Sequence, residues 1–140
     1  MGNRRLPAAT REASRKGRMV FPQMKRSDIC VFCRIAEGTV PARIVYEDSE
    51  VIAFQDRHPQ APHHILVIPR QHITKLHEIT ESEVPLIGKL LMVARDVAES
   101  LGLNENGYRI VINNGAGAGQ SVFHLHVHLL AGRPMHWPPG

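Results

Sequence analysis

The strongest periodic pattern in the 140-residue chain lies in residues 84–101. Apolar side chains recur there at steps of three and four residues, which places them on one face of an α-helix. Upstream, Thr80 and Glu83 have the spacing of a capping box. Pro85 suits a first helical turn, and Gly102 favours termination. These features predict one long amphipathic helix.

Five further segments are rich in β-branched and aromatic residues, which is typical of strands. They cover residues 43–47, 51–55, 64–69, 108–113 and 123–130. Three polar residues separate the first two segments, so we expect these two to form a hairpin. Strands and helix do not alternate strictly along the chain. This order favours an α+β fold with an antiparallel sheet.

The segment at 123–130 alternates between apolar residues and histidine. Because successive side chains of a strand point to opposite faces, two rows are expected. The core-facing row is Phe123, Leu125, Val127 and Leu129, and the opposite row is His124, His126 and His128. A merely solvated face would be served equally well by other polar residues. The histidine row therefore indicates either a metal site or nucleophilic and acid–base catalysis.

A glycine-rich loop at residues 113–121 precedes these histidines. Its three glycines would let backbone N–H groups approach an anion. The loop lacks the lysine of a Walker motif and leads into a strand rather than a helix, so it fits neither common nucleotide-binding fingerprint. Its place next to three histidines favours binding of a phosphate group.

The net charge of +4 is distributed unevenly along the chain. Residues 1–26 carry a net charge of +7, whereas residues 27–140 carry −3. We interpret 1–26 as a basic, poorly ordered extension and 27–140 as one domain. Because the basic charge lies outside that domain, a specific nucleic-acid-binding face is not expected. An arginine-rich leader is also typical of organelle transit peptides.

Two further classes are excluded by composition. Two cysteines are too few for a disulfide scaffold. The chain also has no run of about 18 apolar residues, so we expect no transmembrane helix and no membrane partner.

Residues 120–130 resemble the signature of the histidine triad (HIT) family, in which three histidines alternate with apolar residues. The ending at residues 132–140 resembles that of the Hint branch, the histidine triad nucleotide-binding proteins. The resemblance extends over residues 28–140. It implies an α+β fold with a five-stranded antiparallel sheet, one long helix and a short one. It also implies a homodimer with a continuous ten-stranded sheet, in the cytoplasm, or in mitochondria if residues 1–26 are a transit peptide.

The activity implied by the resemblance is hydrolysis of purine nucleoside 5′-phosphoramidates, such as conjugates of AMP or GMP with an amine. His126 would be the nucleophile, and the backbone carbonyl of His124 would fix its tautomer. His128 and Ser121 would bind phosphate oxygens, and no catalytic cofactor would be required. The remaining implied site residues are His64 in catalysis and Asp56, Phe32, Phe54, Asn113, Gly119 and Gln120 in nucleotide binding, with Asp56 at the ribose and the two phenylalanines at the base.

Arg57 and His58 depart from the Hint pattern, which commonly has apolar and small residues there, and this leaves the base preference open. Three alternatives also stay open. The enzyme could act on dinucleoside polyphosphates or other mononucleotidyl substrates, or the chain could be a nucleotide-binding regulatory scaffold. It could also be a metal hydrolase that uses the three alternating histidines together.

Cys30 and Cys33 form a CxxC pair. They could be two reduced, partly buried thiols, whereas a thioredoxin-like redox pair is disfavoured because no βα unit follows. The resemblance implies a third interpretation, structural zinc held by this pair together with His72 and His124. A Cys₂His₂ set suits a closed tetrahedral site.

Overall fold

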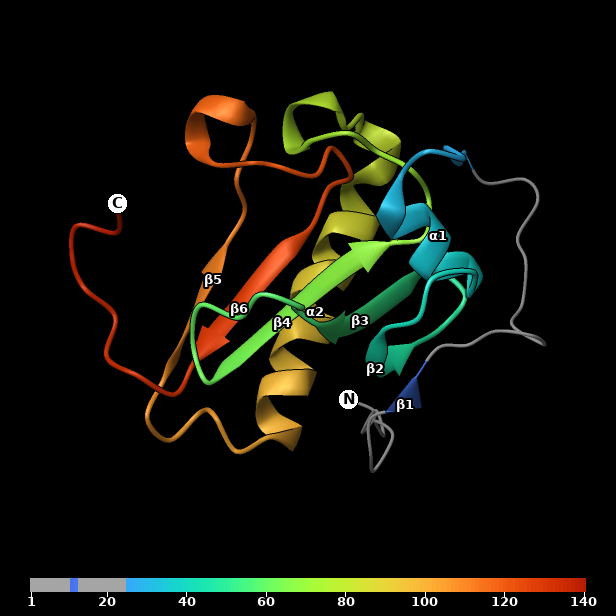
Figure 1. The fold of residues 1–140 in the computed structure, drawn as a ribbon. Helices are drawn as coiled ribbons and strands as arrows, with labels where there is room; N and C mark the ends of the chain where they lie inside the picture. The colour runs from blue at the N-terminus through green and yellow to red at the C-terminus, as the bar shows by residue number, and fades with distance from the viewer. Residues whose placement is uncertain (1–10, 13–24) are drawn as a thin grey trace.

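The computed structural model describes residues 11–12 and 25–140 (Figure 1). The proposed extension over 1–26 therefore falls mainly on residues outside the described part. The strands are β1 (Arg11–Glu12), β2 (Arg43–Glu47), β3 (Val51–Gln55), β4 (His63–Pro69), β5 (Tyr108–Val111) and β6 (Val127–Ala131). The α-helices are α1 (Val31–Glu37) and α2 (Val84–Ser100). Short 3₁₀ turns lie at Leu76–Glu78, Glu81–Glu83 and Ala116–Ala118.

The strands form one antiparallel sheet in the order β1-β2-β3-β4-β6-β5. The predicted α+β class, with five antiparallel strands, one long helix and a short one, is confirmed. The two-residue β1 adds a sixth strand beside β2. The predicted hairpin is also confirmed, because β2 pairs with β3 across the turn at residues 48–50.

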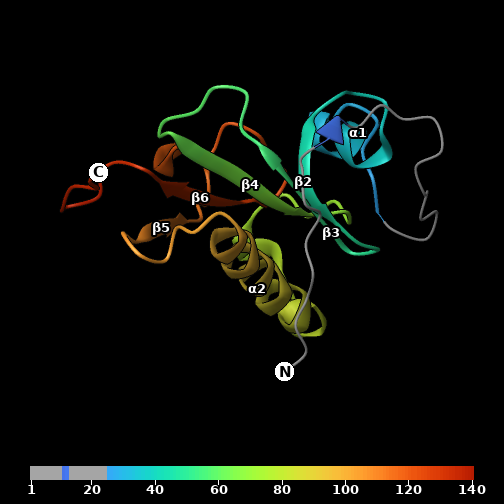
Figure 2. The ribbon, with the colours of Figure 1, turned by 90° about the horizontal axis from the view of Figure 1, so that it is seen from below.

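The two helices cover opposite faces of the sheet (Figure 2). Helix α2 packs on one face through Leu90, Val93 and Val97, which are almost fully buried. Helix α1 packs on the other face. Its residues Phe32 and Ile35 belong to the same apolar cluster as two residues of the sheet, Phe54 and Leu66.

Cross-strand register aligns a row of side chains on the α1 face. Phe54 of β3 pairs with Leu66 of β4, and Leu66 pairs with His128 of β6. Side chains of directly paired residues point to the same face. The register therefore places one of the predicted histidines beside the apolar cluster under α1.

Helix α2 begins as the sequence predicts. Thr80 and Glu83 form a capping box, which leads through a 3₁₀ turn into the helix at Val84. The chain leaves the helix through Gly102, whose φ of 71° is in the left-handed region that glycine tolerates best.

The prediction of a strand over 123–130 is wrong in its first half. The strand begins at Val127, and Phe123, predicted to face the core, is 45% exposed. The predicted facing of the next two residues is nevertheless confirmed. Leu125 packs into the core cluster under α2, and His124 contacts Phe32 of α1 on the opposite face. The cause of the late strand start is the segment around Ile73, which lies beside this part of the chain. The N–H of Leu125 donates to the Ile73 carbonyl (2.6 Å) and not to a neighbouring strand. The strand predicted over 108–113 likewise ends at Val111.

Within residues 11–12 and 25–140, no helix combines the length and the apolar character needed to cross a membrane.

Candidate active site

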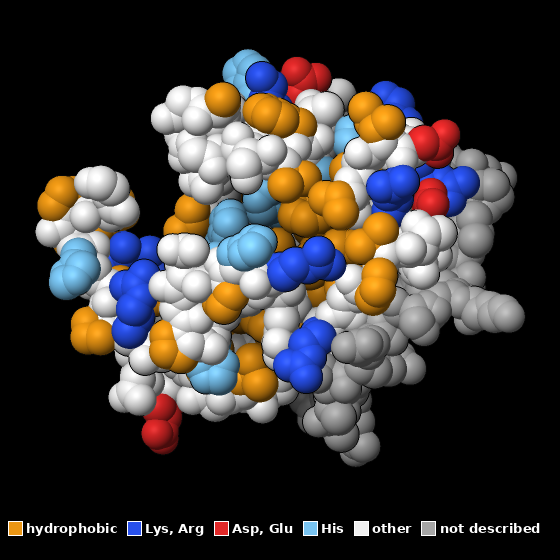
Figure 3. All heavy atoms as spheres, in the orientation of Figure 1, with side chains coloured by type: hydrophobic (Ala, Val, Ile, Leu, Met, Phe, Trp, Pro, Cys, Tyr) orange, Lys and Arg blue, Asp and Glu red, His pale blue; other side chains and the backbone are white. Residues whose placement is uncertain are grey.

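A cleft of about 1000 Å³ opens on the face of the sheet that carries α1. One end is lined by histidines and the small loop residues Gly119 and Ser121. The other end is lined by apolar side chains, among them Val31, Ile35 and Pro41. Figure 3 shows histidines gathered near the middle of this face, next to hydrophobic side chains and to a Lys or Arg side chain. A volume of this size accommodates a mononucleotide.

His126 lines the polar end of this cleft and has a defined tautomer. Its Nδ1 lies 2.6 Å from the backbone carbonyl of His124. A carbonyl only accepts hydrogen bonds, so Nδ1 carries the proton and donates it. In the neutral ring Nε2 is then unprotonated, and its lone pair is available as a nucleophile or base.

His128 contacts His64, which in turn contacts Asp56. The Nδ1 of His64 accepts the backbone N–H of Gln60 (3.0 Å), so the proton of neutral His64 lies on Nε2. That Nε2 is 2.9 Å from Nδ1 of His128 and 3.3 Å from Oδ2 of Asp56. His128 therefore accepts at Nδ1 and carries its own proton on Nε2. The site thus combines one imidazole with a free Nε2 lone pair and another with an Nε2–H donor.

Burial keeps both imidazoles neutral. It lowers the pKa of His126, partly offset by the hydrogen bond to the His124 carbonyl and by the charge of Asp56. It lowers the pKa of His128 to about 4, with a further contribution from the charges of His126 and His64. The pKa of His64 is also lowered by burial, against the opposing effect of Asp56.

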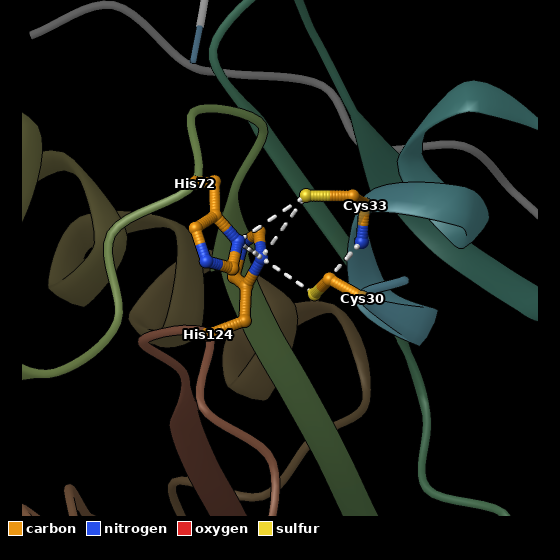
Figure 4. Close-up of side chains that lie close together, drawn as sticks. All are labelled: Cys30, Cys33, His72 and His124. Carbon is orange, nitrogen blue, oxygen red and sulfur yellow. Dashed lines mark hydrogen bonds between the residues drawn. The ribbon is translucent and has the colours of Figure 1, made fainter. Parts of the chain in front are cut away.

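A second cluster lies beside the cleft, where Cys30 and Cys33 meet His72 and His124 (Figure 4). One potential ligand atom from each residue lies within 4.8 Å of the other three. The ring of His124 donates from Nε2 to the Pro69 carbonyl (2.8 Å), which leaves its Nδ1 lone pair facing the cluster.

The distances in this cluster fit a tetrahedral metal site. Nδ1 of His124 lies 3.3 Å from Sγ of Cys30, 3.6 Å from Sγ of Cys33 and 3.3 Å from Nδ1 of His72. Nδ1 of His72 lies 3.3 Å from Sγ of Cys33. Zinc–ligand bonds of ordinary length place two nitrogens about 3.4 Å apart, and sulfur and nitrogen about 3.6 Å apart. Two soft sulfurs and two imidazoles are also the donor set that zinc prefers.

Burial raises the pKa of the Cys33 thiol to about 11, and it lowers the pKa of His124 to about 4 and also that of His72. The imidazoles are thus in the neutral form that a metal needs, whereas the Cys33 thiol needs a nearby cation to ionise.

The three alternating histidines do not converge on one point. His124 is fully buried with its ring in the cysteine cluster, whereas His126 and His128 line the cleft. The hypothesis of a metal hydrolase that uses all three together is therefore contradicted. The physical reason lies in the contacts of His124, because its Nε2 is held by the Pro69 carbonyl and its Nδ1 faces Cys30 and His72.

Comparison with known proteins connects this geometry to a family. Residues 37–135 match the family model described as "HIT domain". The chain belongs to the HIT domain family. Similar proteins include a HIT family hydrolase from Legionella pneumophila, whose crystal structure is 47% identical with a TM-score of 0.78, covering 79% of this chain and 99% of that one. The enzyme class suggested by such relatives is a hydrolase.

Two further relatives bear names that relate to ligands. A 14 kDa zinc-binding protein from Zea mays is 50% identical over 112 residues, which cover 79% of this chain and 87% of the relative. A histidine triad nucleotide-binding protein from Candida albicans is 34% identical with a TM-score of 0.67, and the match covers 78% of this chain and 82% of that one.

The cleft of this HIT domain brings together most of the residues singled out in the sequence. Its lining includes Phe32, Phe54, Asp56, His64, Gly119, Ser121, His126 and His128. Asn113 and Gln120 are not in the lining. The Gln120 amide instead fixes the glycine loop, accepting from the N–H of Gly115 (2.7 Å) and donating to the carbonyls of Thr74 and Val122.

Sequence reasoning missed several parts of the HIT cleft. Apolar lining residues from α1 and from the segment before β2 (Val31, Ile35, Pro41 and Ala42) read as ordinary core or turn positions. The backbone N–H of Gln60 that sets the tautomer of His64 has no signal in the sequence, because any residue other than proline supplies it. Arg43 also lines the cleft, although it reads as the first residue of a strand.

Proposed function

We propose that this HIT protein is a Hint-type hydrolase that cleaves purine nucleoside 5′-phosphoramidates through a nucleotidyl-His126 intermediate. The observation that carries the proposal is the 2.6 Å hydrogen bond from Nδ1 of His126 to the His124 carbonyl, because it makes Nε2 the unprotonated nitrogen of a side chain that lines the cleft. The name of the Candida albicans relative supports the assignment to nucleotides.

In the first step, Nε2 of His126 attacks the phosphorus, a P–N(histidine) bond forms, and the P–N bond to the leaving amine breaks. The amine takes up a proton from solvent water as it leaves. In the second step, water attacks the phosphorus and returns a proton to the solvent. The P–N(histidine) bond breaks, and the released nucleotide leaves His126 with its Nε2 lone pair restored.

The neighbouring residues stabilise the charge that develops on the phosphoryl oxygens. The Nε2–H of His128 and the hydroxyl of Ser121 both belong to residues that line the polar end of the cleft. Hydrogen-bond donors that are already oriented stabilise a developing anion without the reorganisation that bulk water requires. His64 acts through His128, since its Nε2–H holds the His128 proton on the nitrogen that serves as donor.

Substitution of His126 tests this mechanism. We expect His126→Ala to lower turnover of adenosine 5′-phosphoramidate at least about 10³-fold, because the covalent step is lost. His63→Ala is the matched control, since His63 directly precedes His64 in the chain but does not line the cleft. Release of the amine and mass spectrometry of the quenched enzyme would be followed. Undiminished turnover in His126→Ala, or a nucleotide attached to another residue, would contradict the proposal.

We propose also that Cys30, Cys33, His72 and His124 hold a structural zinc ion. The ligand distances and the name of the maize relative support this assignment. Zinc would supply a fixed cross-link rather than a reacting centre, because the four side chains complete its usual coordination number. The backbone carbonyl of His124 stays available to His126.

We propose further that the chain forms a homodimer. Strand β5 lies at one edge of the sheet, and an edge strand can pair with a second copy. Leu91 and Met92 of α2 are 42% and 44% exposed, and large apolar side chains of this kind are common at subunit interfaces.

A further inference from the structure

Arg57 places a cation at the apolar end of the cleft. It directly follows Asp56, lines the cleft and is exposed. Its Nη2 lies 3.4 Å from the backbone carbonyl of Pro41, another lining residue. This contact is long for a hydrogen bond and is open to water, so little free energy is lost when the guanidinium exchanges it for a ligand.

The location of a nucleotide in the cleft follows from the reacting group. With the phosphorus at Nε2 of His126, the base extends away from the polar end and reaches the apolar end. Two aromatic rings lead in that direction, because Phe32 lies edge to face with His126 (ring centroids 5.2 Å apart) and with Phe54 (5.5 Å). These rings, with Val31 and Ile35, supply the apolar surface against which a base packs. The edge of the base then lies towards the cleft rim at Pro41 and Arg57.

We propose that Arg57 makes this cleft selective for guanine over adenine, an inference that rests on the proposed function. A guanidinium has donors only, arranged in a rigid fork. Guanine presents two acceptors, O6 and N7, on one edge, and two N–H groups of arginine can bond to both. Adenine has N7 but a donating amino group at the position of O6, so one guanidinium N–H would face another donor.

The test compares guanosine and adenosine 5′-phosphoramidates that carry the same amine. We expect kcat/KM of the wild type to favour the guanosine substrate about tenfold, towards the low end of discrimination by a bidentate arginine because the site is open to water. Arg57→Ile and Arg57→Lys should bring the ratio close to one. The lysine variant keeps the charge but not the fork, so it separates base readout from general attraction of anions.

Arg34→Gln is the matched control, since Arg34 is an exposed arginine of α1 that does not line the cleft, and it should keep the wild-type ratio. A wild-type ratio near one, a preference for adenosine, or a guanosine preference that survives in Arg57→Ile would overturn the inference. If neither substrate is turned over, the proposed function fails. The inference is then decided by calorimetric binding of GMP and AMP: a GMP preference lost in Arg57→Ile supports it, and equal affinities overturn it.

Discussion

His124 serves two sites with different parts of one residue. The Nδ1 atom of its ring faces the cysteine cluster, and its backbone carbonyl accepts a hydrogen bond from Nδ1–H of His126. A shift of the His124 backbone therefore moves both the ring and the carbonyl, because the two are joined at one Cα. The position of the proposed nucleophile therefore depends on the order of the neighbouring cluster.

Asp48 holds the turn between β2 and β3 through both carboxylate oxygens. Oδ1 accepts the backbone N–H groups of Glu50 (2.8 Å) and Val51 (2.9 Å). Oδ2 accepts the Tyr46 hydroxyl (2.5 Å) and an ion pair from Lys89 of α2 (3.0 Å). This one side chain thus joins the hairpin to the long helix.

The pKa of Asp48 predicts how stability depends on pH. Burial raises this pKa, but the hydrogen bonds from Tyr46, the turn and Lys89 outweigh burial and lower it from 3.8 to about 2. Because the folded pKa lies below the unfolded one, the stabilisation is complete above about pH 4 and is lost as the pH falls towards about 2. We expect Asp48→Asn to lower the free energy of unfolding at neutral pH by about 1–2 kcal/mol.

Urea denaturation at several pH values measures this effect. The difference between wild type and Asp48→Asn should narrow between about pH 4 and about pH 2 as the wild-type carboxylate becomes protonated. Glu105→Gln, which changes an exposed carboxyl in a loop, is the control. A difference that stays constant down to the lowest pH would show that the charge of Asp48 does not stabilise the fold.

At the scale of elements, local signals predicted the hairpin and α2 correctly. The turn at residues 48–50 and the capping box at Thr80 each act within a few positions of the chain. The start of β6 could not be predicted in this way. It depends on Ile73, which binds the N–H of Leu125, and on the distant cysteines that face the ring of His124.

The proposed zinc ion would join three elements. Cys30 and Cys33 lie at the start of α1, His72 follows β4, and His124 precedes β6. Because α1 forms a wall of the cleft, loss of the metal should loosen both the helix and the site. We expect Cys33→Ser to lose bound zinc and, at free zinc 100 to 1,000 times Kd, about 3–4 kcal/mol of stability.

Elemental analysis and thermal unfolding, with and without a chelator, measure both effects. His77→Ala is the control, because this exposed histidine lies outside the cluster. The chelated wild type should unfold at the temperature of Cys33→Ser. Gently purified wild type that contains no zinc, and whose two thiols react freely, would refute the proposed site.

At the scale of the whole molecule, most of the residues singled out in the sequence line the cleft, but the sequence did not predict how the fold brings them together. The alternation around His126 and His128 identified two residues that line the cleft. His64 joins them through the pairing of β4 with β6, and Asp56 through the pairing of β3 with β4, which local patterns do not specify. The cysteine cluster spans still longer separations, so only the family resemblance indicated its members before the structure did.

The proposed homodimer would cover two features of the single chain. A continuous sheet across two copies would pair the backbone hydrogen-bonding groups at the edge strand β5, and packing of Leu91 and Met92 would remove apolar surface from water. We expect the wild type to sediment with twice the mass of one chain. Introducing two lysines, Leu91→Lys and Met92→Lys, should give monomers, because a pair of buried unpaired charges costs more than such an interface gains.

The control is Ile29→Lys, which adds a lysine at a side chain that is 92% exposed and lies outside both α2 and β5. A monomeric wild type would contradict the homodimer, and a double variant that stays dimeric would place the interface away from this face of α2.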